Sequence, residues 1–268
     1  MIAILRAFLI RDFYIELSYR LSFFFTITSV LFGSFTYFFI AQLIDGQANA
    51  FLAPYGGDYF AFVIIGIAFG GYFSVGLNGF TNALRRAQTT GTLEAMMMTP
   101  TPVPLIIIGS AVWNYIFTTW RVIVVLIVGI LFLNLRFYDA NYLAAFVVLI
   151  LAIIAFASIG ILAASIIMVV KRGDPIATLF GTVANLIGGV LYPIEILPTW
   201  LQPFSYLLPI TYALRAIRLA LLTGASWAEL QTDIIALIIF CLILFPTSLL
   251  TFRYAVNYAR ADGSLTHY

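Results

Sequence analysis

The sequence predicts an all-α integral membrane protein with six transmembrane helices. Three observations lead to this prediction: 63% of the 268 residues are hydrophobic, only 9% are charged, and the mean hydropathy is +1.07. Soluble domains carry about 25% charged residues, so a chain this apolar cannot cover its surface with polar groups. The length fits one compact helical bundle, and we treat residues 1–268 as a single transmembrane domain.

The N-terminal segment, residues 1–20, alternates charged and bulky apolar side chains. Leu5, Phe8, Leu9 and Phe13 recur at helical spacing, which favours an interfacial helix that lies on the bilayer with its charges in water. The alternative is a simple extension of the first spanning helix. We expect no cleavable signal peptide, because the apolar run that follows is too long and lacks a small-residue cleavage site.

Six apolar stretches follow, and each is predicted to cross the bilayer, since about 20 apolar residues suffice. They are residues 21–44, 59–82, 105–133, 141–170, 176–192 and 227–252. The fifth stretch is short, and Pro246 predicts a kink in the sixth. In the second stretch, Gly66 and Gly70 form a GxxxG pair, a pattern that lets another helix approach closely.

The basic residues predict the orientation of the chain. With the N-terminus inside, nine basic residues fall on the cytoplasmic side and three fall outside, a strong bias for short loops. The inner residues are Arg6, Arg11, Arg20, Arg85, Arg86, Lys171, Arg172, Arg253 and Arg260, and the outer ones are Arg136, Arg215 and Arg218. We therefore expect a multi-pass protein of the cell (inner) membrane with both termini cytoplasmic.

Several kinds of catalytic site are excluded by the residues that the chain lacks. Its only histidine is His267, its only lysine is Lys171, and its only cysteine is Cys241. No histidine-rich metal site, histidine-based triad or GxxxxGK[ST] phosphate loop is therefore possible. We expect a non-enzymatic chain with no catalytic residues, no metal site, no cofactor of its own and no nucleic-acid partner.

The longest polar interruption in the first half of the chain is residues 83–104, which we call the elbow. Gly91 can end a helix that continues from the second span. Thr92 is a suitable N-cap, and Glu94 falls in the first turn, where the helix dipole favours a carboxylate. Three prolines then end the short helix. The pattern favours a short cytoplasmic helix parallel to the membrane; the alternative is an ordinary interfacial loop.

A second unusual stretch, residues 193–226, lies before the sixth span. Its four prolines preclude one continuous helix. The stretch is too broken to span the membrane and too apolar for free solution. A re-entrant pair of short helices on the outer side fits, because broken backbone at membrane depth must be buried in protein. The alternative is an interfacial amphipathic helix.

Both stretches resemble the membrane (permease) subunit of ABC transporters of type 2, of the exporter class. The elbow matches that family through a basic patch, a Gly-Thr-Leu-Glu core and a Thr-Pro pair. These residues are Arg85, Arg86, Gly91, Thr92, Leu93, Glu94, Thr99 and Pro100. The second stretch matches through Pro193, Leu197, Pro198, Trp200, Pro209, Thr211, Tyr212, Arg218 and Gly224. The resemblance implies that the elbow carries a coupling helix, which docks in a groove of an ATP-binding subunit.

The resemblance also implies a function and a set of partners. The chain would be the permease subunit of an ATP-driven exporter and would form the substrate pathway as a dimer, with a second copy or a close relative, surrounded by membrane lipid. ATP and magnesium would bind to separate ATP-binding subunits. The alternative is a secondary transporter or a lipid-handling membrane protein without an ATPase partner. The first would need ion-coupling carboxylates within spans, and every acidic residue lies in a loop or near the end of a span. The second would need an acidic, histidine or cysteine cluster, which the sequence does not show.

A polar stripe marks a possible substrate pathway. Arg121 lies in the middle of the third span, where a charge is costly and usually faces a partner or a wet cavity. Asn114 and Thr118 share its helix face at a spacing of i, i+4 and i+7. Asn78 and Asn185 could face the same space from the second and fifth spans. Arg121 would attract an anionic headgroup or phosphate; the alternative is that it pairs structurally with a carboxylate or carbonyl.

Overall fold

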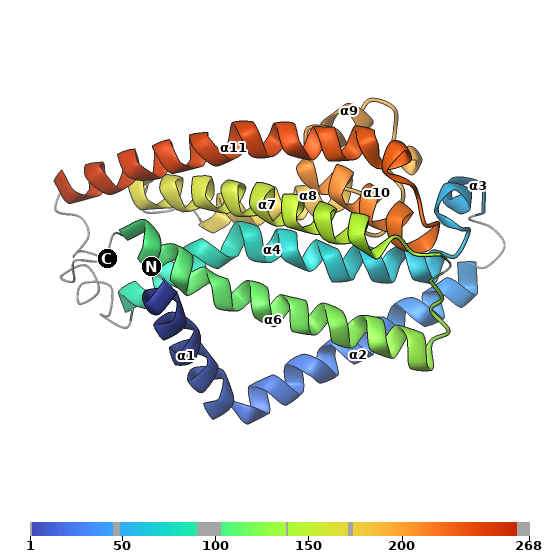
Figure 1. The fold of residues 1–268 in the computed structure, drawn as a ribbon, viewed down its shortest axis with the longest axis horizontal. Helices are drawn as coiled ribbons and strands as arrows, with labels where there is room; N and C mark the ends of the chain where they lie inside the picture. Colours follow the sequence, from blue (N-terminus) through green and yellow to red (C-terminus); the bar gives the residue numbers. More distant parts are fainter. Residues whose placement is uncertain (1, 45–48, 90–102, 138, 171–173, 262–268) are drawn as a thin grey trace.

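The structure, a computed structural model, describes residues 2–44, 49–89, 103–137, 139–170 and 174–261. In this part of the chain every regular element is helical, which confirms the all-α class. The long helices form a bundle, and the short helices gather at one end of it (Figure 1). The elements are α1 (Ile2–Ser18), α2 (Arg20–Ile44), α3 (Asn49–Leu52), η1 (Ala53–Tyr55), α4 (Tyr59–Thr89), α6 (Val103–Phe132), α7 (Tyr142–Val170), α8 (Asp174–Ile187), η2 (Ile194–Ile196), α9 (Gln202–Ser205), α10 (Pro209–Leu222) and α11 (Trp227–Ala261).

Among the described helices, five are long and apolar enough to cross a membrane. Each coincides with one of the six predicted stretches. The candidate spans are Phe24–Ile44 in α2, Tyr59–Asn82 in α4, Ala111–Phe132 in α6, Tyr142–Ile167 in α7 and Trp227–Tyr258 in α11. α11 remains one helix through Pro246.

The fifth predicted span, residues 176–192, does not form as a full-length helix. α8 has 14 residues and rises about 21 Å, short of the roughly 30 Å hydrocarbon core. It stops because Gly188 and Gly189 follow it, and Gly189 has a φ of 79°, a left-handed conformation that ends helices. The described part of the chain therefore holds five long candidate spans and one shorter apolar helix, and the six-span arrangement stays a prediction.

α4 is the central helix of the bundle. In its apolar window 72% of the residues are buried, against 6% for α2 and 11% for α11. α4 packs against α2, α6, α7, α8 and α10. Its buried aromatic side chains include Phe62, Tyr72 and Phe73. The hydrophobic core is therefore built around α4, while α2 and α11 present most of their apolar surface to the outside.

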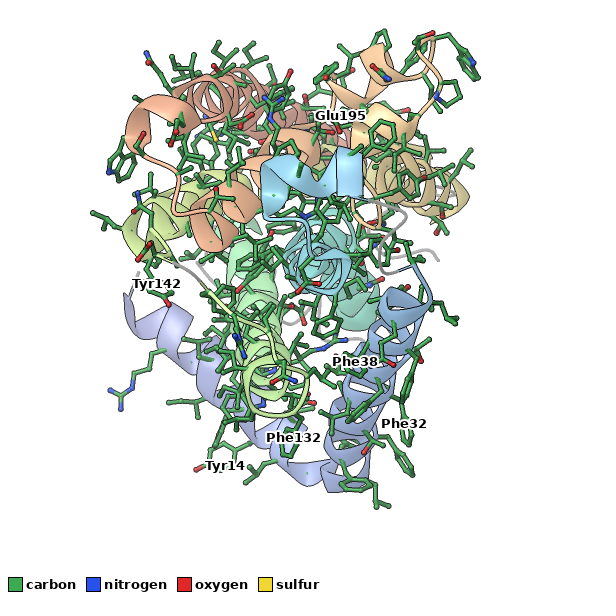
Figure 2. All side chains as sticks on the ribbon, turned by 90° about the vertical axis from the view of Figure 1, so that its right-hand side faces the viewer. Tyr14, Phe32, Phe38, Phe132, Tyr142 and Glu195 are labelled. Carbon is green, nitrogen blue, oxygen red and sulfur yellow. The ribbon has the colours of Figure 1, made fainter. Side chains whose placement is uncertain are left out.

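The outer surface of the bundle is apolar, as lipid contact requires. Figure 2 shows Tyr14, Phe32 and Tyr142 at the edge of the bundle, and each is at least 64% exposed. Phe38 instead points inward from α2, where its ring packs edge-on against Phe60 with centroids 5.4 Å apart. α2 is thus attached to α4 along one face only.

α1 is a separate helix and does not extend the first span. It ends at Ser18, α2 begins at Arg20, and the two run in different directions (Figure 1). The alternative of a simple extension is therefore wrong, while the interfacial position of α1 stays a prediction. α1 packs against α6, where the rings of Phe13 and Trp113 meet edge-on at a centroid distance of 6.0 Å.

α4 and α7 touch through two glycines. An ideal Cβ on Gly160 would lie 1.7 Å from the carbonyl oxygen of Gly76, and one on Gly76 would lie 2.6 Å from the Cβ of Phe156. Phe73 packs edge-on against Phe156 beside this crossing, with ring centroids 5.2 Å apart. Small residues that let backbones approach are a principal means of helix association in lipid, where burial of apolar surface gives little driving force.

We expect Gly160→Ala to destabilise the bundle, because the new methyl group would overlap the Gly76 carbonyl. Overpacking of this kind costs about 2 kcal/mol. Thermal unfolding of the detergent-solubilised chain measures the change as a lower Tm. Gly33→Ala in α2 is the matched control, since an added Cβ there meets nothing within 4 Å. An equal Tm for both variants would contradict the crossing.

Candidate functional site

The elbow falls mostly outside the described residues. Gly91, Thr92, Leu93, Glu94, Thr99 and Pro100 lie in the stretch 90–102, so the coupling helix stays a prediction. α4 continues as a helix to Thr89 and carries Arg85 and Arg86 beyond the predicted second span. α6 begins at Val103. The end of α4 and the start of α6 lie at the end of the bundle where α1 begins (Figure 1).

A cavity of about 240 Å³ lies between α2, α4 and α6, and we call it the central pocket. Arg121 and Thr118 line it from α6, as predicted for a shared face. Arg121 lies near the middle of the span Ala111–Phe132, about 15 Å from each end of that span. The lining residues are Ser29, Val30, Gly33, Ser34, Tyr37, Ile64, Ile67, Ala68, Gly71, Thr118, Arg121, Val122 and Val125.

Three hydrogen-bond donors in the central pocket have no partner within the described part of the chain: the Arg121 guanidinium and the hydroxyls of Tyr37 and Thr118. No acidic side chain is among the lining residues. The structural alternative, in which Arg121 pairs with a carboxylate or carbonyl, is therefore not seen among the described residues. Arg121 is exposed on the isolated chain. An arginine at the centre of a membrane helix costs about 2.5–3.5 kcal/mol on insertion scales, so this charge needs water, a ligand or a group on a second chain.

The pocket residues on α2 were not predicted from the sequence. The hydroxyls of Ser29 and Ser34 donate to carbonyl oxygens of their own helix, Thr26 at 2.8 Å and Val30 at 2.9 Å. Their side chains are thus satisfied, unlike that of Tyr37. The available signal was the recurrence of Ser29, Gly33 and Tyr37 at i, i+4 and i+8, which places small or polar residues on one face of an otherwise aromatic helix.

The three asparagines of the predicted pathway do not line the central pocket. The amide of Asn78 donates to the Ser74 carbonyl oxygen at 3.1 Å, and that of Asn185 donates to the Gly181 carbonyl oxygen at 2.8 Å, each within its own helix. Asn114 lies against α4, with its amide nitrogen 3.7 Å from an ideal Cβ on Gly79. The structure therefore brings Thr118 and Arg121 into one pocket and leaves Asn78, Asn114 and Asn185 outside it.

A buried arginine joins the broken second stretch to α4. Arg218 of α10 is 2% exposed and donates to three carbonyl oxygens. Its Nε bonds to Phe62 at 3.0 Å, its Nη1 to Gly189 at 2.6 Å and its Nη2 to Val190 at 2.7 Å. The guanidinium carbon also lies 3.5 Å from the centroid of the Phe62 ring. Burial lowers the pKa of Arg218 to about 9, so the group remains protonated at neutral pH.

The position of Arg218 explains why residue 66, the first of the GxxxG pair, is a glycine. An ideal Cβ on Gly66 would lie 2.0 Å from the Val190 carbonyl oxygen and 2.1 Å from Nη2 of Arg218. Gly70 is less crowded, with Val190 Cγ1 at 3.4 Å. The pair does permit a close approach, as predicted, but at Gly66 the approaching groups are the backbone of Val190, beyond the end of α8, and the guanidinium of Arg218.

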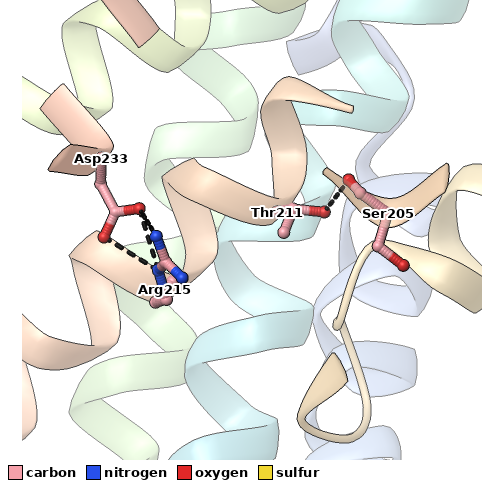
Figure 3. A network of polar contacts seen from close by, with 4 residues as sticks. All are labelled: Ser205, Thr211, Arg215 and Asp233. Atoms are coloured by element: carbon pink, nitrogen blue, oxygen red, sulfur yellow. Dashed lines mark hydrogen bonds and ion pairs between the residues drawn. The ribbon is translucent and has the colours of Figure 1, made fainter. Parts of the chain in front are cut away.

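A second polar contact ties α10 to α11. Arg215 donates from Nε to both carboxylate oxygens of Asp233, at 2.9 and 3.1 Å, and also from Nη2 (Figure 3). On the same helix, Thr211 donates to the Ser205 carbonyl oxygen at 2.7 Å (Figure 3). Arg215 and Arg218, counted as outer-loop charges in the orientation argument, are thus structural residues of α10.

The five long apolar helices define the class as a multi-pass membrane protein. The model of the ABC-2 type transporter family matches residues 3–222, which is most of the chain. The chain belongs to the ABC-2 type transporter family. Members of this family are membrane components of transporters, are generally non-catalytic and in general work with an ATP-binding subunit.

Curated relatives agree with the family. The probable multidrug ABC transporter permease YbhR of Escherichia coli strain K12 is 28% identical over 132 residues, which cover 48% of this chain and 35% of the relative. The protein of the same name from Escherichia coli O157:H7 gives the same values. The chain therefore spans about a third of the length of the curated relatives that it matches.

We expect Arg218→Met to destabilise the protein by about 4 kcal/mol. The substitution leaves the carbonyl oxygens of Gly189 and Val190 without a hydrogen-bond donor, and each buried unpaired group costs about 1–3 kcal/mol. Thermal unfolding in detergent measures the loss. Arg218→Lys keeps the charge but loses the forked geometry, and an intermediate Tm is expected. Arg253→Met, at an exposed position of α11, is the control. An unchanged Tm for Arg218→Met would rule out the three-carbonyl contact as a stabilising element.

Proposed function

We propose that this chain is the permease subunit of an ATP-driven exporter and that it forms the substrate pathway as a dimer, with a second copy or a close relative. ATP and magnesium would bind to separate ATP-binding subunits. The observation that carries the proposal is the family match over residues 3–222, combined with the placement of the elbow between two long helices of the bundle. The absence of a phosphate loop from the sequence supports an ATPase on another chain.

The proposed coupling runs through α4. The elbow would dock on the ATP-binding subunit through Glu94 and its neighbours, with Arg85 and Arg86 on the adjoining end of α4. Because α4 is the most buried span and packs against five other helices, a push at the elbow would act on the core of the bundle. Sub-ångström shifts at one site become larger rearrangements when packed elements have two stable arrangements.

The proposed orientation places both termini in the cytoplasm of a cell whose inner membrane holds the bundle. α1 begins and α11 ends at the same end of the bundle as the end of α4 and the start of α6 (Figure 1), which supports this orientation. The stretch 193–226 would then form the outer re-entrant hairpin, and α10, with eleven buried residues, supports burial of that backbone in protein.

The alternative functions receive less support. A secondary transporter needs an ion-coupling carboxylate within a span, yet the acidic residues of the five candidate spans are Glu229, paired with Ser226, and Asp233, paired with Arg215. A lipid-modifying enzyme needs a cluster of reactive groups, and the described residues hold no group of three or more histidine, cysteine, aspartate or glutamate side chains that could bind a metal.

The direct test of the proposed function is reconstitution. Affinity-tagged full-length chain should co-purify with an ATPase that contains a phosphate loop, and the complex in proteoliposomes should show ATPase activity that cargo stimulates. Because a relative is named as a probable multidrug permease, amphipathic drugs are the first cargo class to screen. Transport that continues without any ATPase and follows an ion gradient would instead establish the secondary transporter.

We expect Glu94→Lys to uncouple ATP hydrolysis from transport without unfolding the bundle. Loss of a charge contact at a buried interface costs about 2 kcal/mol or more, roughly a 30-fold change in an equilibrium constant. Hydrolysis and vesicular transport are measured on the same preparation. The matched control is Glu195→Lys, the same charge reversal at an exposed position at the end of the bundle where the short helices gather (Figure 2). Full coupled transport in Glu94→Lys would remove the elbow assignment.

We expect Arg121→Ala to lower export while leaving assembly with the ATPase intact, since Arg121 lines the central pocket and lies far from the elbow along α6. Initial transport rates and co-purification yield are the two readouts. Unchanged export would exclude Arg121 from the pathway, and a parallel loss of assembly would make its role structural.

A further inference from the structure

The central pocket combines two kinds of surface. Tyr37, Thr118 and Arg121 contribute hydrogen-bond donors to its lining, and aliphatic side chains such as Val30, Ile64 and Ile67 form much of the rest. Its volume of about 240 Å³ exceeds the roughly 150 Å³ cavities that bind benzene-sized molecules. A ligand that satisfied both surfaces would carry a charged head and an apolar body.

The sign of that head follows from the donors. Arg121 carries a fixed positive charge, and the two hydroxyls can donate to an acceptor oxygen. Since no acidic side chain lines the pocket and none of the three donors has a partner among the described residues, the missing acceptor must come from outside this part of the chain. Carboxylate and phosphate oxygens are the groups that a guanidinium binds best.

The route into the pocket is set by α2. This helix has only 6% of its apolar window buried and contacts the bundle along one face. Two glycines widen the pocket on facing helices: an ideal Cβ on Gly33 of α2 meets nothing within 4 Å, and the nearest atom to one on Gly71 of α4 is Thr118 Cγ2 at 3.6 Å. A ligand dissolved in the bilayer would therefore reach Arg121 by passing beside a weakly attached helix.

We propose that the central pocket binds the oxyanion head of an amphiphile that enters laterally from the bilayer, with Arg121 as the charge partner and Tyr37 and Thr118 as hydrogen-bond donors. The role of such a ligand as cargo rests on the proposed export function. The binding of the ligand to the pocket does not rest on that function, because occupancy can be measured without ATP, an ATP-binding subunit or transport. The two ideas can therefore fail separately.

Photo-crosslinking tests the proposal on the purified full-length chain in phosphatidylcholine nanodiscs. The probe is a twelve-carbon fatty acid with a diazirine in its tail, compared with the matched fatty alcohol. We expect the acid to label pocket-lining residues of α2 and α4, and the alcohol to label them at background level. Arg121→Gln should lower labelling by the acid about tenfold, equal to a loss of about 1.4 kcal/mol. Arg121→Lys should retain most of the labelling, and Tyr37→Phe should cause a smaller loss.

Two further variants separate binding from folding. Gly33→Leu fills the pocket without touching Arg121, so it should abolish labelling at an unchanged Tm. Arg253→Gln removes the same charge from an exposed position of α11 and should change nothing. A second arm uses a diazirine-bearing phosphatidylglycerol: selective labelling by this lipid alone would support the oxyanion site and assign it to a phospholipid. Equal labelling by acid and alcohol, or full labelling of Arg121→Gln, would overturn the proposal and leave a hydrated cavity only.

Discussion

Backbone polar groups at membrane depth need partners within the protein, and this constraint governs the second half of the fold. α8 stops after 14 residues and leaves the carbonyls of Gly189 and Val190 without helical partners. Arg218 supplies the donors, and it reaches them from α10 while bonding to Phe62 of α4. One forked side chain thus holds the end of the short helix α8, the broken stretch and the central helix together, since a guanidinium offers several donors in a fixed geometry.

The same central helix carries the other features of the molecule. On one face α4 lines the central pocket with α2 and α6, and on another it contacts α7 at Gly76. In its first turns, the Phe62 carbonyl oxygen accepts a hydrogen bond from Arg218. Its far end leads into the elbow. Under the proposed coupling, α4 would connect the elbow with the polar residues of the central pocket through a single continuous helix.

The sequence predicted the fold class and the five long spans well, because about 20 apolar residues leave few alternatives to a membrane helix. The sequence did not predict where α8 ends, because the apolar pattern continues past the glycine turn at 188–189. Helical spacing placed Asn114, Thr118 and Arg121 on one face, and of these Thr118 and Arg121 line the central pocket while Asn114 does not. The sequence could not show that Asn78 and Asn185 lie outside this pocket, because spacing within one helix says nothing about which face a neighbouring helix covers. The partners of Gly66 came from residues more than a hundred positions away.

The contact between Gly76 and Gly160 has a consequence for how sequences of this kind can diverge. Most packing contacts drift by compensation, in which one side chain shrinks as its neighbour grows. Neither partner here has a side chain to shrink. An added methyl group on Gly160 would strike the Gly76 carbonyl oxygen, and one on Gly76 would strike the Cβ and backbone of Phe156. A larger residue at either position could be accommodated only by moving α7 away from α4 along its length. Substitution at this crossing therefore requires a change in the spacing of the two helices, and a change at one glycine cannot be compensated by a change at the other.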